Sequence, residues 1–347
     1  MGTTERGLGD YTRDHGPGSN GVGPGGDVTL FEVAGLSYTY SSGRAGLANV
    51  SLQAGPGERV VIMGPNGSGK STLLRLVSTE LPAPRGTLRL FESGWDSTSR
   101  RLASRRLRGR LGVVQDQAVH FEELTGMENG LFFAELYGVG EPEAEPRLAA
   151  LFSNFGIEAV RDVEVGEYSY GMRKKLLLAE ALVHDPELLI LDEPTLGLDP
   201  PSQAAFLEIL EDRSACGTCS LIATNEPGLA RRVATNVVFL SKGEVVAQGA
   251  PEELLEGFGG KTTIEVSVTG HTADTIAVEG ATVMAQQGRI VAESEMGTKI
   301  LPDLAIAILA TGLEILRIDV REPDLADLFT TLTGLHIADS SVRGEDG

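Results

Sequence analysis

The chain has 347 residues, of which 41% are hydrophobic, and a formal net charge of −20. This length suggests about two domains on a prior of roughly 150 residues each, and the composition is that of a folded globular protein, not a fibrous or disordered one. The negative charge argues against a protein that mainly grips nucleic acid, because neutralising phosphates requires a surplus of Lys and Arg. No apolar run reaches the ~18 residues needed to cross a bilayer. The best candidate, residues 304–316, is short and contains Glu314.

The first 27 residues are rich in glycine and almost free of apolar side chains. Such a segment cannot offset the entropy of ordering, so we predict a disordered tail over residues 1–27. Strand-like runs follow at 30–33, 50–52 and 60–63, separated by Gly/Pro turns. The third run leads directly into a glycine-rich stretch.

That stretch, Gly64-Pro-Asn-Gly-Ser-Gly-Lys-Ser71, matches the phosphate-binding loop template at each fixed position, between a strand and an expected helix at 71–79. Its glycines allow backbone N–H groups to close around phosphates, and the helix N-terminus adds positive potential. We expect Lys70 to contact the β- and γ-phosphates and Ser71 to ligate Mg²⁺. The predicted nucleotide-binding residues are Gly64, Pro65, Asn66, Gly67, Ser68, Gly69, Lys70, Ser71 and Thr72. The chain is therefore predicted to bind a nucleoside triphosphate.

After a further expected strand at 87–91, residues 100–110 contain six arginines. This segment is interpreted as a solvated helix-turn face, with a phosphate or lipid-head contact as the alternative. From 125 to about 160, apolar residues recur at helical spacing. Strands then alternate with helices, which indicates a largely parallel α/β sheet: we expect helices at 173–183 and 202–210, and strands at 188–191, 220–223 and 237–240.

The composition changes after residues 251–260, and a small α+β domain is predicted over 262–335, followed by a flexible tail at 336–347. The domain shows no catalytic constellation. Its last expected helix begins at Pro323-Asp324 and carries Leu325, Leu328, Phe329 and Leu332 on one face. The other expected elements are strands at 263–268, 282–284, 289–292 and 314–320 and a helix near 303–310.

A second chemical motif is Leu188-Leu-Ile-Leu-Asp192-Glu193-Pro194. Four apolar residues predict a buried strand, and its carboxylates emerge at the carboxyl end, where ligands bind open α/β sheets. Asp192 can hold Mg²⁺ through water, and Glu193 can act as a general base toward the attacking water.

Two further segments give the chain a family resemblance. Tyr168-Ser169-Tyr170-Gly171-Met172 resembles the signature motif of ATP-binding cassette (ABC) transporter ATPases, and Thr195-Leu-Gly-Leu198-Asp199 is similar to that family's dimer-contact loop. The order of phosphate loop, signature, acidic strand and dimer loop fits this family over about residues 28–255. The resemblance implies the P-loop NTPase fold of ABC ATPases, of the α/β class. This fold has a mainly parallel core sheet, an antiparallel β subdomain and an inserted helical subdomain, here at about 118–165.

The resemblance also implies how the ATP site is completed. Two cassettes, identical or different, dimerise head to tail, so that Ser169, Gly171 and Asp199 act on ATP held by the partner's loop. An aromatic residue after the first strand stacks on adenine in this family. Tyr40 occupies that place, Tyr38 is a second candidate, and ordinary packing is the alternative for either tyrosine.

The ends of the ABC-like region indicate a subfamily. Residues 321–334 resemble the tail of exporter ATPases of the daunorubicin-resistance type, and residues 122–138 look like the helical region that receives the membrane partner in that group. The resemblance implies a separate transmembrane permease and a cytoplasmic protein, peripheral on the inner face of the cell membrane. The N-terminus lacks the basic-then-apolar pattern of a signal peptide, which agrees with this location. We expect no nucleic-acid partner, and the cargo is not readable.

Three positions depart from the family pattern. Asn225 replaces the switch histidine; it can hydrogen-bond a phosphate or water but cannot carry a positive charge. Asp116 aligns with the glutamine that faces Mg²⁺ and the attacking water. It is an acceptable metal ligand, and a one-residue slip would place Gln115 or Gln117 there instead. Tyr170 stands where the signature more often has Gly.

The sequence therefore predicts an ATP-binding and ATP-hydrolysing subunit of an ABC exporter. Its predicted catalytic residues are Glu193 and Asn225, its metal ligands Ser71, Asp192 and Asp116, and its cofactors ATP and Mg²⁺. The alternative is a regulatory cassette with weak ATPase activity, paired with a more active one, because Asn225 suggests a slower or asymmetric cycle. A soluble cassette acting on ribosomes or DNA is disfavoured, because those relatives generally carry two cassettes or long coiled arms.

The two cysteines, Cys216 and Cys219, form a Cys-x-x-Cys pattern. This spacing would allow a redox pair or half of a zinc site, but no second Cys or His pair accompanies it. We expect two reduced cysteines in a loop.

Overall fold

The computed structural model describes residues 29–82, 85–91, 93–95, 105–115, 119–270 and 276–335. The predicted tails, Asp116, Gln117 and residues 100–104 of the arginine-rich segment lie outside these ranges. The described residues form two compact units, 29–250 and 251–335, and each is treated separately below.

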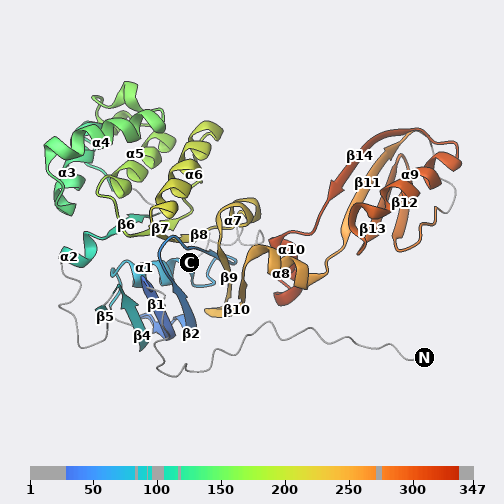
Figure 1. Cartoon of the computed structure of the whole chain (residues 1–347), viewed down its shortest axis with the longest axis horizontal. Helices are drawn as coiled ribbons and strands as arrows, with labels where there is room; N and C mark the ends of the chain where they lie inside the picture. Colours follow the sequence, from blue (N-terminus) through green and yellow to red (C-terminus); the bar gives the residue numbers. More distant parts are fainter. Residues whose placement is uncertain are drawn as a thin grey trace. The chain divides into compact units, whose positions relative to one another are not determined.

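A six-stranded, largely parallel sheet organises the first unit (Figure 1), with the order β10-β9-β3-β8-β7-β6. Neighbouring strands from β9 to β6 are parallel, and β10 is antiparallel to β9. The central strands are continuous apolar runs, as expected for parallel strands covered on both faces. The strands are β3 (Arg59–Met63), β6 (Leu111–Val114), β7 (Leu188–Asp192), β8 (Cys219–Ala223), β9 (Asn236–Ser241) and β10 (Glu244–Gly249).

The position of Cys219 corrects the prediction of two loop cysteines. Cys216 is exposed at the end of a helix, but Cys219 is the first residue of β8 and is buried. Burial raises the pKa of the Cys219 thiol to about 12, so it remains protonated at neutral pH. Both cysteines are free, as expected.

An antiparallel sheet packs against the same core and supports the phosphate loop. Its order is β2-β1-β4-β5. Side chains from this sheet, including Phe31 and Leu88, share one hydrophobic cluster with Ile62 of β3 and Leu73 of α1 (Lys70–Val77), the helix that follows the loop. The strands are β1 (Phe31–Thr39), β2 (Ala45–Ala54), β4 (Arg85–Leu90) and β5 (Ser93–Trp95).

The inserted helical region consists of α3 (Gly126–Tyr137), α4 (Glu141–Asn154) and two 3₁₀ turns, η1 (Glu158–Val160) and η2 (Val165–Glu167), and packs on α5 (Tyr170–Leu182) (Figure 1). Helix α3 starts with a capping box, in which the Thr125 hydroxyl accepts from the Glu128 backbone N–H and the Glu128 carboxylate accepts from the Thr125 backbone N–H. The remaining helices of this unit are α2 (Arg105–Arg108), α6 (Pro200–Ala215) and α7 (Pro227–Val233).

Two arginines of the 100–110 segment have protein partners. Arg108 donates from Nε to the Thr79 hydroxyl at 3.2 Å, and Arg110 forms an ion pair with Glu187 at 2.5 Å. The Arg110 guanidinium also lies 3.6 Å from the centre of the Phe91 ring. These two side chains therefore serve contacts within the protein.

A buried histidine that follows α5 connects α3 with the sheet. His184 stacks on the Tyr137 ring at 3.8 Å, and its Nε2 donates to the Leu111 carbonyl at 3.0 Å. Burial is the main cause that lowers the pKa of His184 to about 4. The imidazole is therefore neutral in the folded protein at pH 7.

This depressed pKa predicts an acid-sensitive contribution to stability. A histidine with an unfolded pKa of 6.5 and a folded pKa of about 4 binds its proton more readily in the unfolded chain. The contribution of His184 to the free energy of unfolding is present above pH 6.5. About 2 to 3 kcal/mol of it is lost as the pH falls toward 4. We expect His184→Phe to remove this part of the pH dependence, measured by urea denaturation at a series of pH values. An equally steep acid limb in the variant would contradict the assignment.

The second unit is a small α+β domain built on one antiparallel sheet, with the order β12-β13-β11-β14. One face of this sheet packs against a helix, through Ile264, Val266 and Ile290 on the strands and Leu304 and Ile308 on α9. Helix α8 precedes the predicted start of the domain at residue 262 and contacts α10 within this unit. The elements are α8 (Pro251–Phe258), β11 (Thr262–Val268), β12 (Thr282–Gln286), β13 (Arg289–Ser294), η3 (Gly297–Ile300), α9 (Leu301–Ala310), β14 (Ile315–Arg321) and α10 (Leu325–Thr333).

Candidate nucleotide-binding site

Three neighbouring parallel strands bring the predicted site residues to one edge of the core sheet. Strand β8 lies between β3 and β7, and their carboxyl ends are in register. The phosphate loop follows β3, Glu193 follows β7, and Asn225 lies two residues after β8. Two backbone bonds hold the ends together: Thr224 N–H donates to the Ile62 carbonyl at 3.1 Å and Glu193 N–H to the Ala223 carbonyl at 2.9 Å.

Glycines in the loop are required by its backbone. Gly64 has φ 154°, and a Cβ there would lie 2.1 Å from the Leu240 carbonyl oxygen. Gly69 has φ 111°, and its Cβ would lie 2.6 Å from the Gly46 carbonyl oxygen. Gly67 also has positive φ but faces open space. The loop is thus tightly packed against the protein at its two ends and accessible in its middle.

The polar groups of the loop suit a bound anion. Helix α1 begins at Lys70, directly after Gly69, and within the described residues no N-cap side chain bonds to its first N–H groups, which can therefore bind a ligand. The Ser68 hydroxyl is buried and has no hydrogen-bond partner within the described part of the chain. A triphosphate would satisfy both sets of donors.

Lys70 supplies the positive charge of the loop. Its Nζ donates to the Gly64 carbonyl at 2.5 Å and to the Pro65 carbonyl at 3.4 Å. Burial lowers the pKa of Lys70, while the nearby carboxylates of Glu193 and Asp192 oppose this shift. A buried ammonium that donates to loop carbonyl groups gains a stronger acceptor when a phosphate enters.

Glu193 supplies a carboxylate at the same edge of the sheet as the phosphate loop. Its backbone has φ 42°, and its Oε2 accepts from the Thr224 hydroxyl at 3.1 Å. Burial raises the pKa of Glu193, and the hydrogen bond from Thr224 and the charge of Lys70 act in the opposite direction. Asp192, the last residue of β7, is half-buried, and Ser71 is exposed on the first turn of α1.

Thr224 is a site residue that sequence reasoning did not assign. Besides binding Glu193, its hydroxyl accepts from the Glu226 N–H at 3.1 Å. The next residue, Asn225, is half-buried, and its Oδ1 has no partner in the described ranges. The only sequence signal for Thr224 was its place beside Asn225 after a buried strand.

Tyr40 lies beside the loop. Its hydroxyl is 2.8 Å from the Thr72 hydroxyl on α1, and its ring meets Tyr38 edge-on at 5.1 Å. Gly46 makes this approach possible, because a Cβ there would lie 2.9 Å from the Thr72 methyl and 3.0 Å from the Tyr40 ring. Both tyrosines are also partly packed on the core, so the geometry agrees with either predicted role.

Ser169, Gly171 and Asp199 form a second group at the starts of α5 and α6. Ser169 is the N-cap of α5, where its Oγ accepts from the Met172 N–H at 3.2 Å. Asp199 caps α6 by accepting from the Ser202 N–H at 3.0 Å and pairs with Lys175 at 2.6 Å. The hydrogen bond from Lys175, followed by those from Ser202, holds the pKa of Asp199 well below its usual range.

The first turn of α5 contacts the loop before α6, because a Cβ on Gly171 would lie 2.9 Å from the Gly197 carbonyl oxygen. Tyr170 packs so closely over Gly197 that a Cβ there would lie 2.4 Å from its ring. Glycine at position 197, with φ 81°, is what accommodates the bulky residue of this signature.

The capping role of Asp199 leads to a prediction about stability. Asp199→Ala is expected to lower the free energy of unfolding by about 1 kcal/mol, since α6 loses its N-cap acceptor. The ion pair with Lys175 should contribute less, because the Asp199 side chain is 50% exposed and solvent partly screens the pair. Asp199→Asn, which keeps an acceptor, should therefore cost less than Asp199→Ala in urea denaturation. Equal losses in the two variants would show that the cap is not the cause.

Helix α5 also holds the segment that follows β6. Lys174 is buried, and its Nζ donates at 3.3 Å to the carbonyl oxygens of both Gln115 and Asp192. The buried His120 and Glu180 side chains lie 3.2 Å apart, from Nε2 to Oε2. The side-chain amide of Gln115 donates a hydrogen bond to the Glu80 carboxylate. Asp116 itself lies outside the described residues, so its register stays a prediction.

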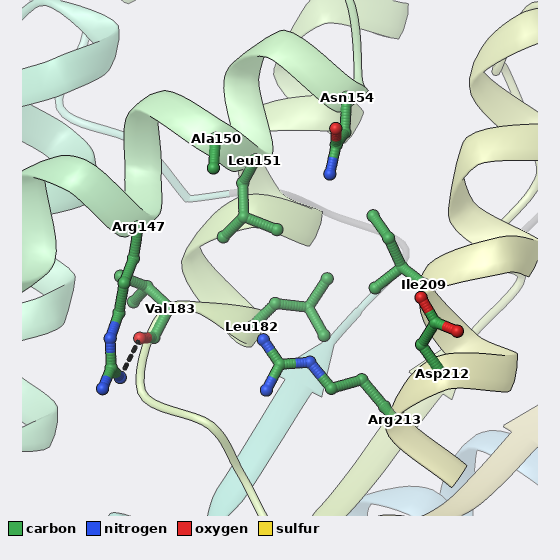
Figure 2. A pocket seen from close by; sticks show the side chains of 9 residues that line it. All are labelled: Arg147, Ala150, Leu151, Asn154, Leu182, Val183, Ile209, Asp212 and Arg213. Carbon is green, nitrogen blue, oxygen red and sulfur yellow. Dashed lines mark hydrogen bonds between the residues drawn. The ribbon is translucent and has the colours of Figure 1, made fainter. Parts of the chain in front are cut away.

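A separate cavity of about 280 Å³ lies between α4, α5 and α6. Figure 2 shows Leu151, Leu182 and Ile209 lining it, with Arg147 donating to the Val183 carbonyl at 3.0 Å. Its lining contains none of the predicted nucleotide-binding residues. The cavity is therefore distinct from the candidate site.

Comparison with known proteins agrees with this geometry. Residues 47–196 match the ABC transporter family model. The daunorubicin/doxorubicin resistance ATP-binding protein DrrA of Streptomyces peucetius is 33% identical over 317 residues, with 89% of this chain and 93% of the relative covered. The chain belongs to the ABC transporter family.

Other relatives in this family are similar along most of their length. The Nod factor export ATP-binding protein I of Sinorhizobium fredii is 31% identical over 90% of this chain and 88% of its own. The linearmycin resistance ATP-binding protein LnrL of Bacillus subtilis is 28% identical over 84% of this chain and 94% of its own. This ABC protein is thus similar to ATP-binding proteins named for drug resistance and export, which confirms the predicted subfamily resemblance.

Solved structures confirm the predicted fold class. An ATP-binding subunit of an ABC transporter aligns with a TM-score of 0.60 and 32% identity, over 67% of this chain and 94% of the other. A dimeric ATP-binding cassette bound to ADP and Pi aligns with a TM-score of 0.58 over 64% of this chain and 98% of the other; at 24% identity it supports the fold alone. The family is one of ATPases, and ATP hydrolysis is the activity it implies.

Within the described ranges, no helix of this ABC protein has both the length and the apolar character to span a membrane.

Proposed function

We propose that this ABC protein is the ATP-hydrolysing subunit of an exporter and that it powers a separate transmembrane permease. The observation that carries the proposal is the place of Glu193, at the sheet edge that also presents the phosphate loop, where Thr224 orients its carboxylate through a bond of 3.1 Å. A carboxylate in this place can accept a proton from the attacking water. The protein would act in the cytoplasm, on the inner face of the cell membrane. Because its relatives are named for different cargoes, the proposal extends to export and to no particular cargo.

Lys70, Ser71 and Asp192 are the residues assigned to the triphosphate and to Mg²⁺. Lys70 would exchange the Gly64 carbonyl for the β- and γ-phosphates, and the Ser71 hydroxyl and Asp192 carboxylate are oxygen ligands of the kind Mg²⁺ prefers. When bound, Mg²⁺ neutralises charge that develops on the phosphate oxygens. Among the described residues no cluster of three or more His, Cys, Asp or Glu could hold a metal. This agrees with an ion held largely by phosphates and water.

Asn225 is assigned to the attacking water and the γ-phosphate. Its amide can accept a hydrogen bond from water through Oδ1 and donate to phosphate through Nδ2. Unlike the histidine usual in the family, it adds no positive charge. We expect its turnover to be slower than that of a histidine-bearing site, by on the order of 10²-fold.

A second cassette, identical or different, would complete the site. In such a dimer Ser169 and Gly171, at the start of α5, and the loop that ends at Asp199 would reach the partner's nucleotide, with Tyr40 stacked on adenine in its own subunit. Tyr170 and Leu196 support this arrangement, because these side chains are 55% and 49% exposed beside those residues. A partner subunit would cover them.

The proposed permease contact is a group of exposed apolar side chains called here the apolar patch: Val119, Phe121, Phe132 and Leu136. Phe121 meets Phe132 edge-on at 4.8 Å, and Val119 is 80% exposed. Asn129, fully buried, shapes the loop beneath: it accepts from the Phe121 N–H at 2.9 Å and donates to the Phe121 carbonyl at 3.0 Å. An exposed apolar patch rimmed by polar residues marks an interaction surface. The apolar patch begins four residues after Gln115, whose carbonyl shares the Lys174 ammonium with the carbonyl of Asp192.

Co-expression with a candidate permease tests the proposal. Phe121→Asp and Phe132→Asp should abolish co-purification with the membrane protein and its stimulation of ATPase activity, while ATP binding by the isolated subunit stays unchanged. Met284→Asp is the matched control, because Met284 is a similarly exposed apolar residue in the other unit. Normal coupling in both patch variants would refute this docking surface.

The alternative function is a regulatory cassette that binds ATP stably and hydrolyses it poorly. Asn225 favours this alternative, because its site lacks the positive charge of the usual histidine. The intact Lys70, Asp192 and Glu193 favour hydrolysis. Replacement of Glu193 separates the two functions, as argued in the Discussion.

A further inference from the structure

The C-terminal unit ends its sheet in an unpaired strand. Strand β14 is bonded to β11 on one side, and within the described ranges no strand is bonded to its other side. An open edge exposes a row of backbone N–H and C=O groups that can pair with another strand.

Apolar side chains on β14 are unusually exposed for their position. Ile318 lies opposite Val266, and Val320 opposite Ile264, so both project to the face that packs against α9. They are nevertheless 37% and 43% exposed, and the neighbouring Leu316 is 66% exposed. Helix α9 covers only part of this face near the edge.

Charged side chains alternate with these residues on the other face. Arg317 lies opposite Ser267, Asp319 opposite Glu265 and Arg321 opposite Thr263. Arg317 donates from Nε to Asp319 Oδ1 at 2.9 Å within the strand. The order positive, negative, positive along β14 restricts which strand could pair with it.

We propose that β14 pairs antiparallel with β14 of a second copy, with the two-fold axis passing between the two Ile318 residues. In this register Arg317 lies opposite Asp319 of the other copy, on both sides of the axis. An axis at Asp319 would place Asp opposite Asp and Arg317 opposite Arg321. An axis at Arg317 would place Arg opposite Arg. A shift of one residue would mix the two faces of the sheet.

The proposed pairing also covers the exposed apolar side chains. A two-fold axis perpendicular to the sheet keeps the same face up in both copies, so both α9 helices lie on one side of an extended sheet. Ile318 and Val320 of each copy then meet in the groove between the helices.

This contact goes beyond the proposed function and is independent of it, since it requires neither nucleotide nor permease. It would add a second point of association to a cassette dimer. Two cassettes held on one permease would favour it further, because tethering raises their effective concentration.

Sedimentation of the full chain without nucleotide tests the pairing. We expect dimers whose fraction rises with protein concentration, with a Kd below about 1 mM, the weak end of specific association. Arg317→Asp and Asp319→Arg each place like charges in opposition at two positions, and each should weaken dimerisation by about tenfold or more. An equimolar mixture of the two variants should associate again, because every negative position 317 or 319 then faces a positive one. Neither variant retains the pair within its own strand, so recovery in the mixture reports on the contact between chains.

Wild-type chains that stay monomeric over this range, or a mixture that does not recover, would overturn the proposal. Dimers that neither charge change affects would overturn it as well, since they would form elsewhere.

Cross-linking gives an independent measurement. In a Cys216→Ser background, Ile318→Cys should be joined by a thiol reagent of about 8 Å reach, since directly opposite Cβ atoms lie about 5 Å apart. Met284→Cys, on the opposite edge strand β12, is the matched control and should not cross-link. The native Cys219 is buried and does not interfere. Equal cross-linking at both positions, or none at 318, would contradict the register.

Discussion

Glu193→Gln is expected to lower ATP turnover by at least about 10²-fold, the usual contribution of a general base, while ATP affinity stays close to that of the wild type. The amide keeps the size of the side chain and an acceptor for the Thr224 hydroxyl, but it cannot take a proton from water. Nucleotide binding depends on other groups, namely the loop backbone and Lys70. Steady-state phosphate release and nucleotide titration measure the two properties separately. A dimer that accumulates in ATP is the further expected result, because hydrolysis no longer reopens it.

The matched control is Glu187→Gln. Glu187 precedes the same strand at its opposite end and forms an exposed ion pair with Arg110, so the same chemical change there should leave turnover unaltered. Wild-type turnover in Glu193→Gln would refute the catalytic assignment and support the regulatory cassette. A collapse of turnover would refute the regulatory alternative.

Lys70→Ala is expected to weaken ATP binding by about 10²-fold or more, as removal of one partner of a buried charge pair does. In the structure this ammonium donates to the loop carbonyl groups of Gly64 at 2.5 Å and Pro65 at 3.4 Å. Burial already disfavours its charge, as the lowered pKa of Lys70 indicates. Without nucleotide, the folded Lys70→Ala variant should therefore lose little stability. The substitution should instead lower the stability of the complex with ATP.

Thermal denaturation with and without ATP separates these effects. The variant should unfold near the wild-type temperature without ATP and should gain much less stability when ATP is added. Lys299→Ala, an exposed lysine in the other unit, should respond to ATP as the wild type does. A full ATP-induced shift in Lys70→Ala would show that the loop lysine does not hold the phosphates.

The sequence anticipated the fold of the first unit because its signals are local. Gly64 and Gly69 mark backbone that no other residue could adopt without collision, and the four-residue apolar run before Asp192 has the length and composition of a buried strand, which β7 is. The final helix was equally readable, since Leu325, Leu328 and Phe329 recur at helical spacing and are buried. Cys219 was placed wrongly, because membership of β8 depends on pairing with β7 and not on its Ser/Gly/Thr-rich neighbours.

The sequence by itself determined the family and the fold class, and it predicts the nucleotide chemistry, since the loop from Gly64 to Ser71, Asp192 and Glu193 depend on residue type and on adjacent strands and helices. Tertiary structure alone decided the contacts between distant segments: Thr224 against Glu193, Lys174 against Gln115 and Asp192, and the apolar patch over Asn129. It also decided which apolar residues stay uncovered, such as Ile318 on β14. The physical reason is that exposure and pairing depend on strand order and helix placement, which residues far apart in the chain set together.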